Sequence, residues 1–201
     1  MTRDEEKKRY DTVAVILHWV MAVAFLLMLG SGLSMEYVPM EQSLKFNMYQ
    51  WHKSLGVLLI VAFVARLGWR LFHKPPALPA SIKGPEAVAA KAGHIALYFC
   101  MIAVPVSGWV MVSSSVYGLP TIVFGWFEWP HIPGIAGNEG VNAAGRTAHW
   151  ILAWFFGLCI IGHVAAVAKH AVFEKENLLP RMLPACGCRK TAVNKEPEQQ
   201  P

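Results

Sequence analysis

Five of the eight histidines in this chain lie in or at the ends of long apolar segments. They are His18, His52, His94, His149 and His163. An ionisable side chain in a bilayer is costly, so each of these positions is a functional hypothesis. The neutral imidazole is a common ligand for transition metals and for haem iron. The first question is therefore whether these histidines are spaced to bind a metal.

His149 and His163 carry the most information because both lie on one predicted helix. Fourteen residues separate them, which at the rise of an α-helix is roughly 21 Å along the axis, with the two side chains within roughly 40° of one face. One helix face therefore presents a histidine near each membrane surface. This layout fits two haems stacked in a helical bundle, each needing a second axial ligand from a facing helix.

Depth in the membrane selects the partners of these two histidines. His18 lies near the start of the first apolar segment, which places it near the same membrane surface as His163. His52 and His149 both lie near the opposite membrane surface. The predicted pairs are His18 with His163 and His52 with His149, as axial ligands of two b-type haems. If each histidine instead had a separate packing role, their matched depths would be a coincidence.

His94 has a depth similar to those of His18 and His163. It is an alternative ligand to either of them. It could also line a quinone pocket or relay a proton, since imidazole titrates near neutral pH.

The elements that must position these histidines are membrane helices. The chain has 201 residues, of which 55% are hydrophobic and 15% charged, a composition that indicates a membrane protein. Residues 12–35, 92–127 and 147–168 carry no Asp, Glu, Lys or Arg, and about 20 helical residues cross the hydrocarbon core. We expect helices at residues 12–35, 51–72, 90–112 and 146–172. The predicted fold is all-α, an integral membrane four-helix bundle over residues 12–172.

The positive charges predict the orientation of this bundle. Of the eighteen Lys and Arg residues, only Lys45, Lys53 and Arg146 fall on the side opposite the termini. The positive-inside rule therefore places both termini in the cytoplasm, with residues 1–11 and 173–201 as cytoplasmic tails. The pI of about 9.1 follows from this asymmetry and calls for no nucleic-acid partner.

Two further features are less specific. The segment from Ser113 to Gly145 is rich in aromatic residues, Pro and Gly, and is expected to lie over the outer face, where it could cover a cofactor. Cys186 and Cys188 form a Cys-Gly-Cys sequence in the C-terminal tail, which is weak evidence for metal binding or redox chemistry.

At these residues the chain resembles the bacterial cytochrome b561 family of small di-haem membrane cytochromes. The resemblance runs from Tyr10 to Pro184 and rests on short motifs in order. They are Ile-Leu-His-Trp at residues 16–19, Trp-His-Lys at 51–53, Gly-His at 93–94, His-Trp at 149–150, Gly-His at 162–163 and Leu-Leu-Pro-Arg-Met-Leu-Pro at 178–184. The family resemblance implies haem ligation by His18, His52, His149 and His163, the same set that depth selects.

The resemblance also implies transmembrane electron transfer in the bacterial inner membrane, with membrane quinone as acceptor or donor. One member type resembles a superoxide oxidase that passes electrons to ubiquinone, which would make this chain an oxidoreductase of superoxide:quinone type. The alternative is a haem-bearing membrane subunit that takes electrons from a separate dehydrogenase or hydrogenase. A third hypothesis, a haem-free transporter, uses the histidines for proton or metal traffic.

Haem propionates need cations or hydrogen-bond donors. Lys53 and Arg146 are available on the outer side, with Arg66, Arg70 and Lys169 on the inner side. Each of these cations could equally serve only to set the topology.

Overall fold

The computed structural model describes residues 9–77, 79, 82–173 and 178–183. It contains four long helices, α2 (Thr12–Tyr37), α3 (Gln42–Phe72), α4 (Pro85–Ser113) and α5 (Glu139–Val172). All four are long and apolar enough to span a membrane. A small hairpin of β1 (Thr121–Val123) and β2 (Phe127–Trp129) and a 3-10 turn, η1 (Leu179–Met182), complete the described elements. The predicted membrane-spanning helical fold class is confirmed.

Three helices begin earlier than predicted from the sequence, and one of them is α4, which starts at Pro85 rather than residue 90. α3 starts at Gln42 rather than residue 51, and α5 starts at Glu139 rather than residue 146. Both starts are capped by polar side chains, since Glu41 accepts from the Leu44 amide and Asn138 from the Val141 amide. Such caps satisfy amides of the first turn and stabilise helix outside the hydrocarbon. Hydropathy locates the membrane crossing but not this extension.

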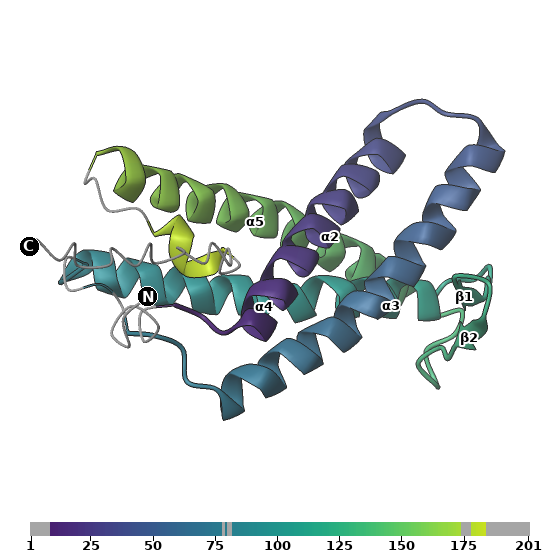
Figure 1. The fold of residues 1–201 in the computed structure, drawn as a ribbon. Helices are drawn as coiled ribbons and strands as arrows, with labels where there is room; N and C mark the ends of the chain where they lie inside the picture. The colour runs from purple at the N-terminus through teal and green to yellow at the C-terminus, as the bar shows by residue number, and fades with distance from the viewer. Residues whose placement is uncertain (1–8, 78, 80–81, 174–177, 184–201) are drawn as a thin grey trace, which may run out of the picture.

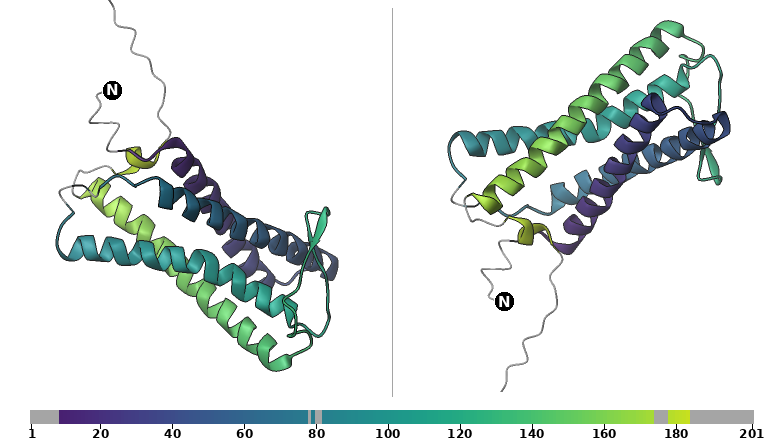
Figure 2. Two further views of the ribbon diagram at one scale, coloured as in Figure 1. Left: turned by 90° about the horizontal axis from the view of Figure 1, so that it is seen from below. Right: turned by 90° about the horizontal axis from the view of Figure 1, so that it is seen from above.

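The helices form two antiparallel pairs, α2 with α3 and α4 with α5, which cross each other at an angle (Figure 1). The views in Figure 2 place the β-hairpin at one end of the molecule and the start of α2 at the other. We call these the hairpin end, where α3 and α5 begin, and the tail end, where α2 begins and α5 finishes. In the described part of the chain, α2 and α5 are not among the helix pairs with extensive backbone contact. The two helices meet through side chains such as Phe25 and Phe156.

The buried core lies midway along the bundle and draws on all four helices. Its members are Met21, Phe25, Leu59, Phe63, Cys100, Met101, Val104 and Phe156. Most other large apolar side chains are exposed on the outside of the helices, which is the expected surface toward lipid tails. The core thus separates the two ends of the bundle.

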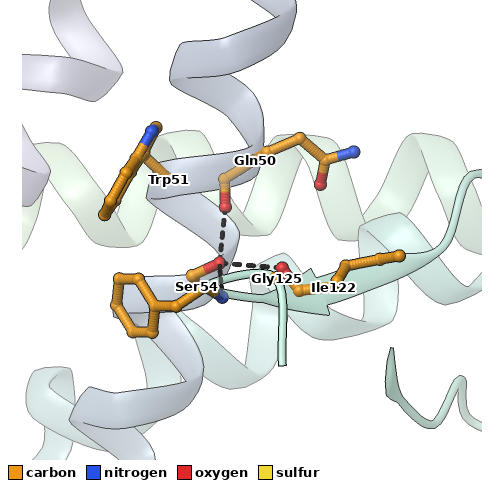
Figure 3. Close-up of a pocket in the computed structure, with 6 residues that line it drawn as sticks. Gln50, Trp51, Ser54, Ile122 and Gly125 are labelled. Carbon is orange, nitrogen blue, oxygen red and sulfur yellow. Dashed lines mark hydrogen bonds between the residues drawn. The ribbon is translucent and has the colours of Figure 1, made fainter. Parts of the chain in front are cut away.

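The β-hairpin is attached to the first half of α3, at Lys53 and Ser54. Ser54 is buried, and its hydroxyl contacts the carbonyl oxygens of Gln50 and Ile122 and accepts from the Phe124 amide (Figure 3). Lys53 Nζ donates to the Pro120 carbonyl at 2.8 Å. These bonds hold the segment predicted as an outer covering, which folds as a hairpin against α3. A cavity of about 170 Å³ remains beside Ser54.

At the tail end, the segment after α5 does not simply leave the bundle as a tail. Trp19 Nε1 donates to the Met182 carbonyl, Arg9 Nε to the Pro180 carbonyl, and the Tyr10 amide to the Arg181 carbonyl. The Leu-Leu-Pro-Arg-Met-Leu sequence therefore binds the start of α2. Cys186 and Cys188 lie outside the described residues.

Candidate functional site

The hairpin-end site is formed by His52 on α3 and His149 on α5. Their ring centroids are 6.3 Å apart and their planes make an angle of 79°. A metal ion lies about 2 Å from a bound imidazole nitrogen, so two imidazoles on opposite sides of one ion have centroids roughly 6 Å apart. The observed separation fits this arrangement.

The hydrogen bonds of these rings leave the second nitrogen of each available. Ser31 Oγ lies 2.8 Å from His52 Nδ1 and donates its own hydrogen to the Met28 carbonyl, so Nδ1 is the donor to Ser31. His149 Nδ1 lies 3.0 Å from the Val104 carbonyl, which can only accept. The ring proton is therefore on Nδ1 in both residues. Nε2 is left as a metal ligand, with the orientation of each ring fixed by its partner.

His149 has a second partner and a close neighbour on α4. Ser107 Oγ lies 3.1 Å from His149 Nδ1 and donates to the Val104 carbonyl. A Cβ at Gly108 would lie 3.1 Å from His149 Cε1 and 3.3 Å from Nδ1. A side chain at this position would therefore require the imidazole to move by a few tenths of an ångström.

The tail-end site contains three histidines. His18 on α2 and His163 on α5 have centroids 6.4 Å apart, with 61° between their planes. His94 on α4 lies closer to His163, at 5.5 Å between centroids. The His18 separation matches that of the hairpin-end pair, whereas the His94 separation is short for two imidazoles across one metal ion. His94 is also exposed, while His18 and His163 are partly buried.

Arg66 of α3 enters the tail-end site. Its Nη2 lies 3.2 Å from His18 Nδ1, and its Nε and Nη1 are buried with no hydrogen-bond acceptor among the described residues. A guanidinium can only donate. This site therefore differs from the hairpin-end site, where serine and carbonyl oxygens accept from Nδ1.

The predicted histidine pairs are thus brought together, one at each end of the core. Sequence reasoning missed Ser31, Ser107 and the contact between Gly108 and His149, and it listed Arg66 only among several cations. Serine within an apolar helix is the signal that points to the first two.

The ligand chemistry fits haem better than a bare metal ion. Among the described residues, no group of three or more His, Cys, Asp or Glu side chains could hold a metal. Protein-bound zinc needs three or four such ligands. Two facing imidazoles suit an iron whose remaining ligands come from a porphyrin.

Comparison with known proteins gives the same assignment. A family model described as prokaryotic cytochrome b561 matches residues 9–185. The chain is 33% identical to cytochrome b561 homolog 2 of Escherichia coli K12 over 176 residues, covering 88% of this chain and 92% of the relative. It is 23% identical to cytochrome b561 homolog 1 of the same organism over 177 residues, covering 88% and 97%. The chain therefore belongs to the prokaryotic cytochrome b561 family, whose membership implies a bacterial multi-pass membrane protein that transfers electrons through b-type haem.

Proposed function

We propose that this chain carries electrons across the bacterial inner membrane through two b-type haems. His52 and His149 bind the haem at the hairpin end, and His18 and His163 bind the haem at the tail end. The observation that carries the proposal is the pair of imidazole separations, 6.3 Å and 6.4 Å, at opposite ends of one bundle. Bound haem supplies one-electron redox chemistry at each site.

The side chains at both ends suit electron transfer rather than reaction at iron. A haem iron held between the two histidines of either site would have no open position for oxygen. Ser31 and the Val104 carbonyl fix the rings at the hairpin end, so little reorganisation accompanies a change of charge. The bundle core between the two sites excludes water and lies about 10 Å from each histidine on α5.

Membrane quinone is the proposed acceptor, and the tail end is the proposed cytoplasmic side. Many more described cations lie near the tail end than near the hairpin end, including Arg9, Arg66, Arg70, Lys74, Lys83, Lys91, Lys169 and Arg181. This asymmetry supports the orientation through the positive-inside rule.

The electron donor acts at the hairpin end, and superoxide is the donor that the family resemblance implies. The summed charge at the hairpin end does not attract an anion, because the glutamates outnumber the cations. The glutamates are Glu36, Glu41, Glu128 and Glu139, and the cations are Lys45, Lys53 and Arg146. Superoxide would therefore depend on local attraction to single cations such as the exposed Arg146. A dehydrogenase or hydrogenase partner is the alternative donor.

A reduced-minus-oxidised spectrum with haem quantitation on the purified protein tests this function. The expected result is two b-type haems per chain. The oxidised protein is then mixed with superoxide in the presence of quinone. Rapid haem reduction followed by quinone reduction would establish an autonomous superoxide oxidase, whereas two haems without that reaction would indicate a cytochrome fed by a partner. A protein without haem would refute the proposal.

A further inference from the structure

Arg66 lies at the tail-end site because of its position on α3. It follows His52 by fourteen residues, the same spacing that separates His149 and His163 on α5. On a helix this spacing is roughly 21 Å of rise and a return to within roughly 40° of the same face. The face of α3 that presents an imidazole to the hairpin end therefore presents a guanidinium to the tail end. The 3.2 Å contact between Arg66 and His18 agrees with this.

Two of the three donor nitrogens of Arg66 have no hydrogen-bond partner among the described residues. Nε and Nη1 are buried and find no acceptor in the part of the chain that the structure describes. No carboxylate among the same residues lies within ion-pair distance of Arg66. Its guanidinium also lies over the Tyr98 ring, with 5.8 Å between the guanidinium carbon and the ring centroid. A buried cation inside a membrane helix calls for an anionic partner.

The other cations considered for such a role are engaged or exposed. Lys53 donates to the Pro120 carbonyl, and Lys169 pairs with Glu86 at 2.5 Å. Arg70 is exposed and lies over the same aromatic ring, 5.2 Å from the Tyr98 centroid. Arg66 is the cation whose buried donors point to a missing anion.

We propose that Arg66 binds a propionate carboxylate of the haem held by His18 and His163. This inference rests on the proposed function. Arginine is suited to the role because its charge persists at all relevant pH values and it forms strong hydrogen bonds with carboxylates.

The contact between Arg66 and His18 also affects which nitrogen of His18 can bind iron. Because Arg66 donates, His18 Nδ1 accepts, and the proton of the neutral ring is on Nε2. Iron ligation through Nε2 requires that nitrogen to be unprotonated. A carboxylate that takes over the hydrogen bonds of Arg66 leaves Nδ1 of His18 to carry the ring proton. Binding of the anion and ligation by His18 are therefore linked through Arg66.

The charge of Arg66 also favours the reduced haem. Reduction adds one negative charge near the carboxylate, and a paired guanidinium offsets it. Replacing Arg66 with a neutral side chain should lower the midpoint potential of one haem and leave the other unchanged. We expect a tenfold loss in the preference for the reduced form, which is 59 mV for one electron.

The experiment is a redox titration of the full-length protein with haem quantitation, comparing wild type, Arg66→Gln, Arg66→Lys and Arg70→Gln. The proposal predicts that Arg66→Gln lowers one potential or loses one haem. Arg66→Lys should retain both haems with a smaller shift, and Arg70→Gln, which removes a neighbouring exposed charge, should match wild type. Two haems with unchanged potentials in Arg66→Gln would overturn the proposal.

A second measurement does not depend on the folding of any variant. Wild-type apoprotein is reconstituted with haem or with its dimethyl ester, which lacks both carboxylates. The ester should shift the same potential in wild type as Arg66→Gln does with ordinary haem. Equal potentials and equal retention of haem and ester in wild type would contradict the proposal. Failure of the proposed function is distinguishable, because it would appear as a wild-type protein without two haems.

Discussion

Phe25 and Phe156 meet edge to face at the centre of the bundle, with 4.9 Å between ring centroids and 85° between planes. Phe156 lies seven residues from His149 and seven from His163, so the pair lies about 10 Å along α5 from each histidine level. Phe156 is only 2% exposed. These two rings join α2 to α5 between the two sites, where the backbones make little direct contact.

Phe156→Ala should therefore loosen the contact between the two sites without removing a ligand. Truncating a buried phenylalanine leaves a cavity that its neighbours fill only partly, so we expect a loss of about 3 kcal/mol in unfolding free energy. The measurement is detergent-induced unfolding of the haem-loaded protein. Phe155→Ala is the matched control, since Phe155 is 45% exposed and should cost much less. Equal stability of the two variants would contradict the central role of the pair.

The pairing of ligands is tested by single alanine variants. His52→Ala and His149→Ala should each abolish the same one of the two haem signals, because each removes one axial ligand from the hairpin-end site. His18→Ala should abolish the other signal. The haem spectra and potentials of each purified variant provide the measurement. If His52→Ala and His149→Ala removed different haems, the proposed pairs would be wrong.

His94 is expected to be dispensable for haem retention. Its centroid lies 5.5 Å from that of His163 and its side chain is exposed, so His18 has the better position opposite His163. His94→Ala should keep two haems by quantitation, and loss of one would identify His94 as a ligand. A role of His94 in quinone binding or proton relay stays a prediction. The rate of quinone reduction in the His94→Ala variant tests it.

Helix spacing explains why the sequence could predict which histidines lie close together in the bundle. A fourteen-residue interval on α5 fixes both the rise and the face, and hydropathy places each residue relative to the membrane. The same reasoning could not supply the rotation of the neighbouring helices. The contacts of Ser31 with His52, Gly108 with His149 and Arg66 with His18 depend on that rotation.

The early starts of α3 and α5 and the β-hairpin also could not be predicted from the sequence. Glu41 and Asn138 cap helical turns that are too polar to register as membrane segments. The hairpin depends on a buried serine, Ser54, more than 60 residues away in sequence. A local sequence pattern contains no signal for such a distant hydrogen bond. The sequence therefore predicted a position at the outer face for the aromatic segment but not its hairpin structure.

Ser31→Ala should weaken haem binding at the hairpin end. It removes the oxygen that accepts from His52 Nδ1, and partners of this kind typically contribute 10-fold to 100-fold in metal affinity. We expect about a 10-fold faster loss of one haem to a haem-scavenging protein. Ser34→Ala is the control, because Ser34 donates only to the Gly30 carbonyl of its own helix. Identical loss rates in the two variants would show that the Ser31 contact does not support the ligand.

Gly108→Ala tests the same site from the opposite helix. The added methyl group would lie 3.1 Å from Cε1 and 3.3 Å from Nδ1 of His149, closer than ordinary contact. Since His149 is held by the Val104 carbonyl and Ser107, the ring must tilt and lose part of that support. Overpacking of this kind costs about 1 to 3 kcal/mol, so we expect selective loss or spectral broadening of the hairpin-end haem. Gly68→Ala adds the same group to α3 with no neighbour within 4 Å and should retain both haems. A Gly108→Ala protein with two unperturbed haems would mean that His149 can move without cost, and that the close approach of α4 does not fix the ligand.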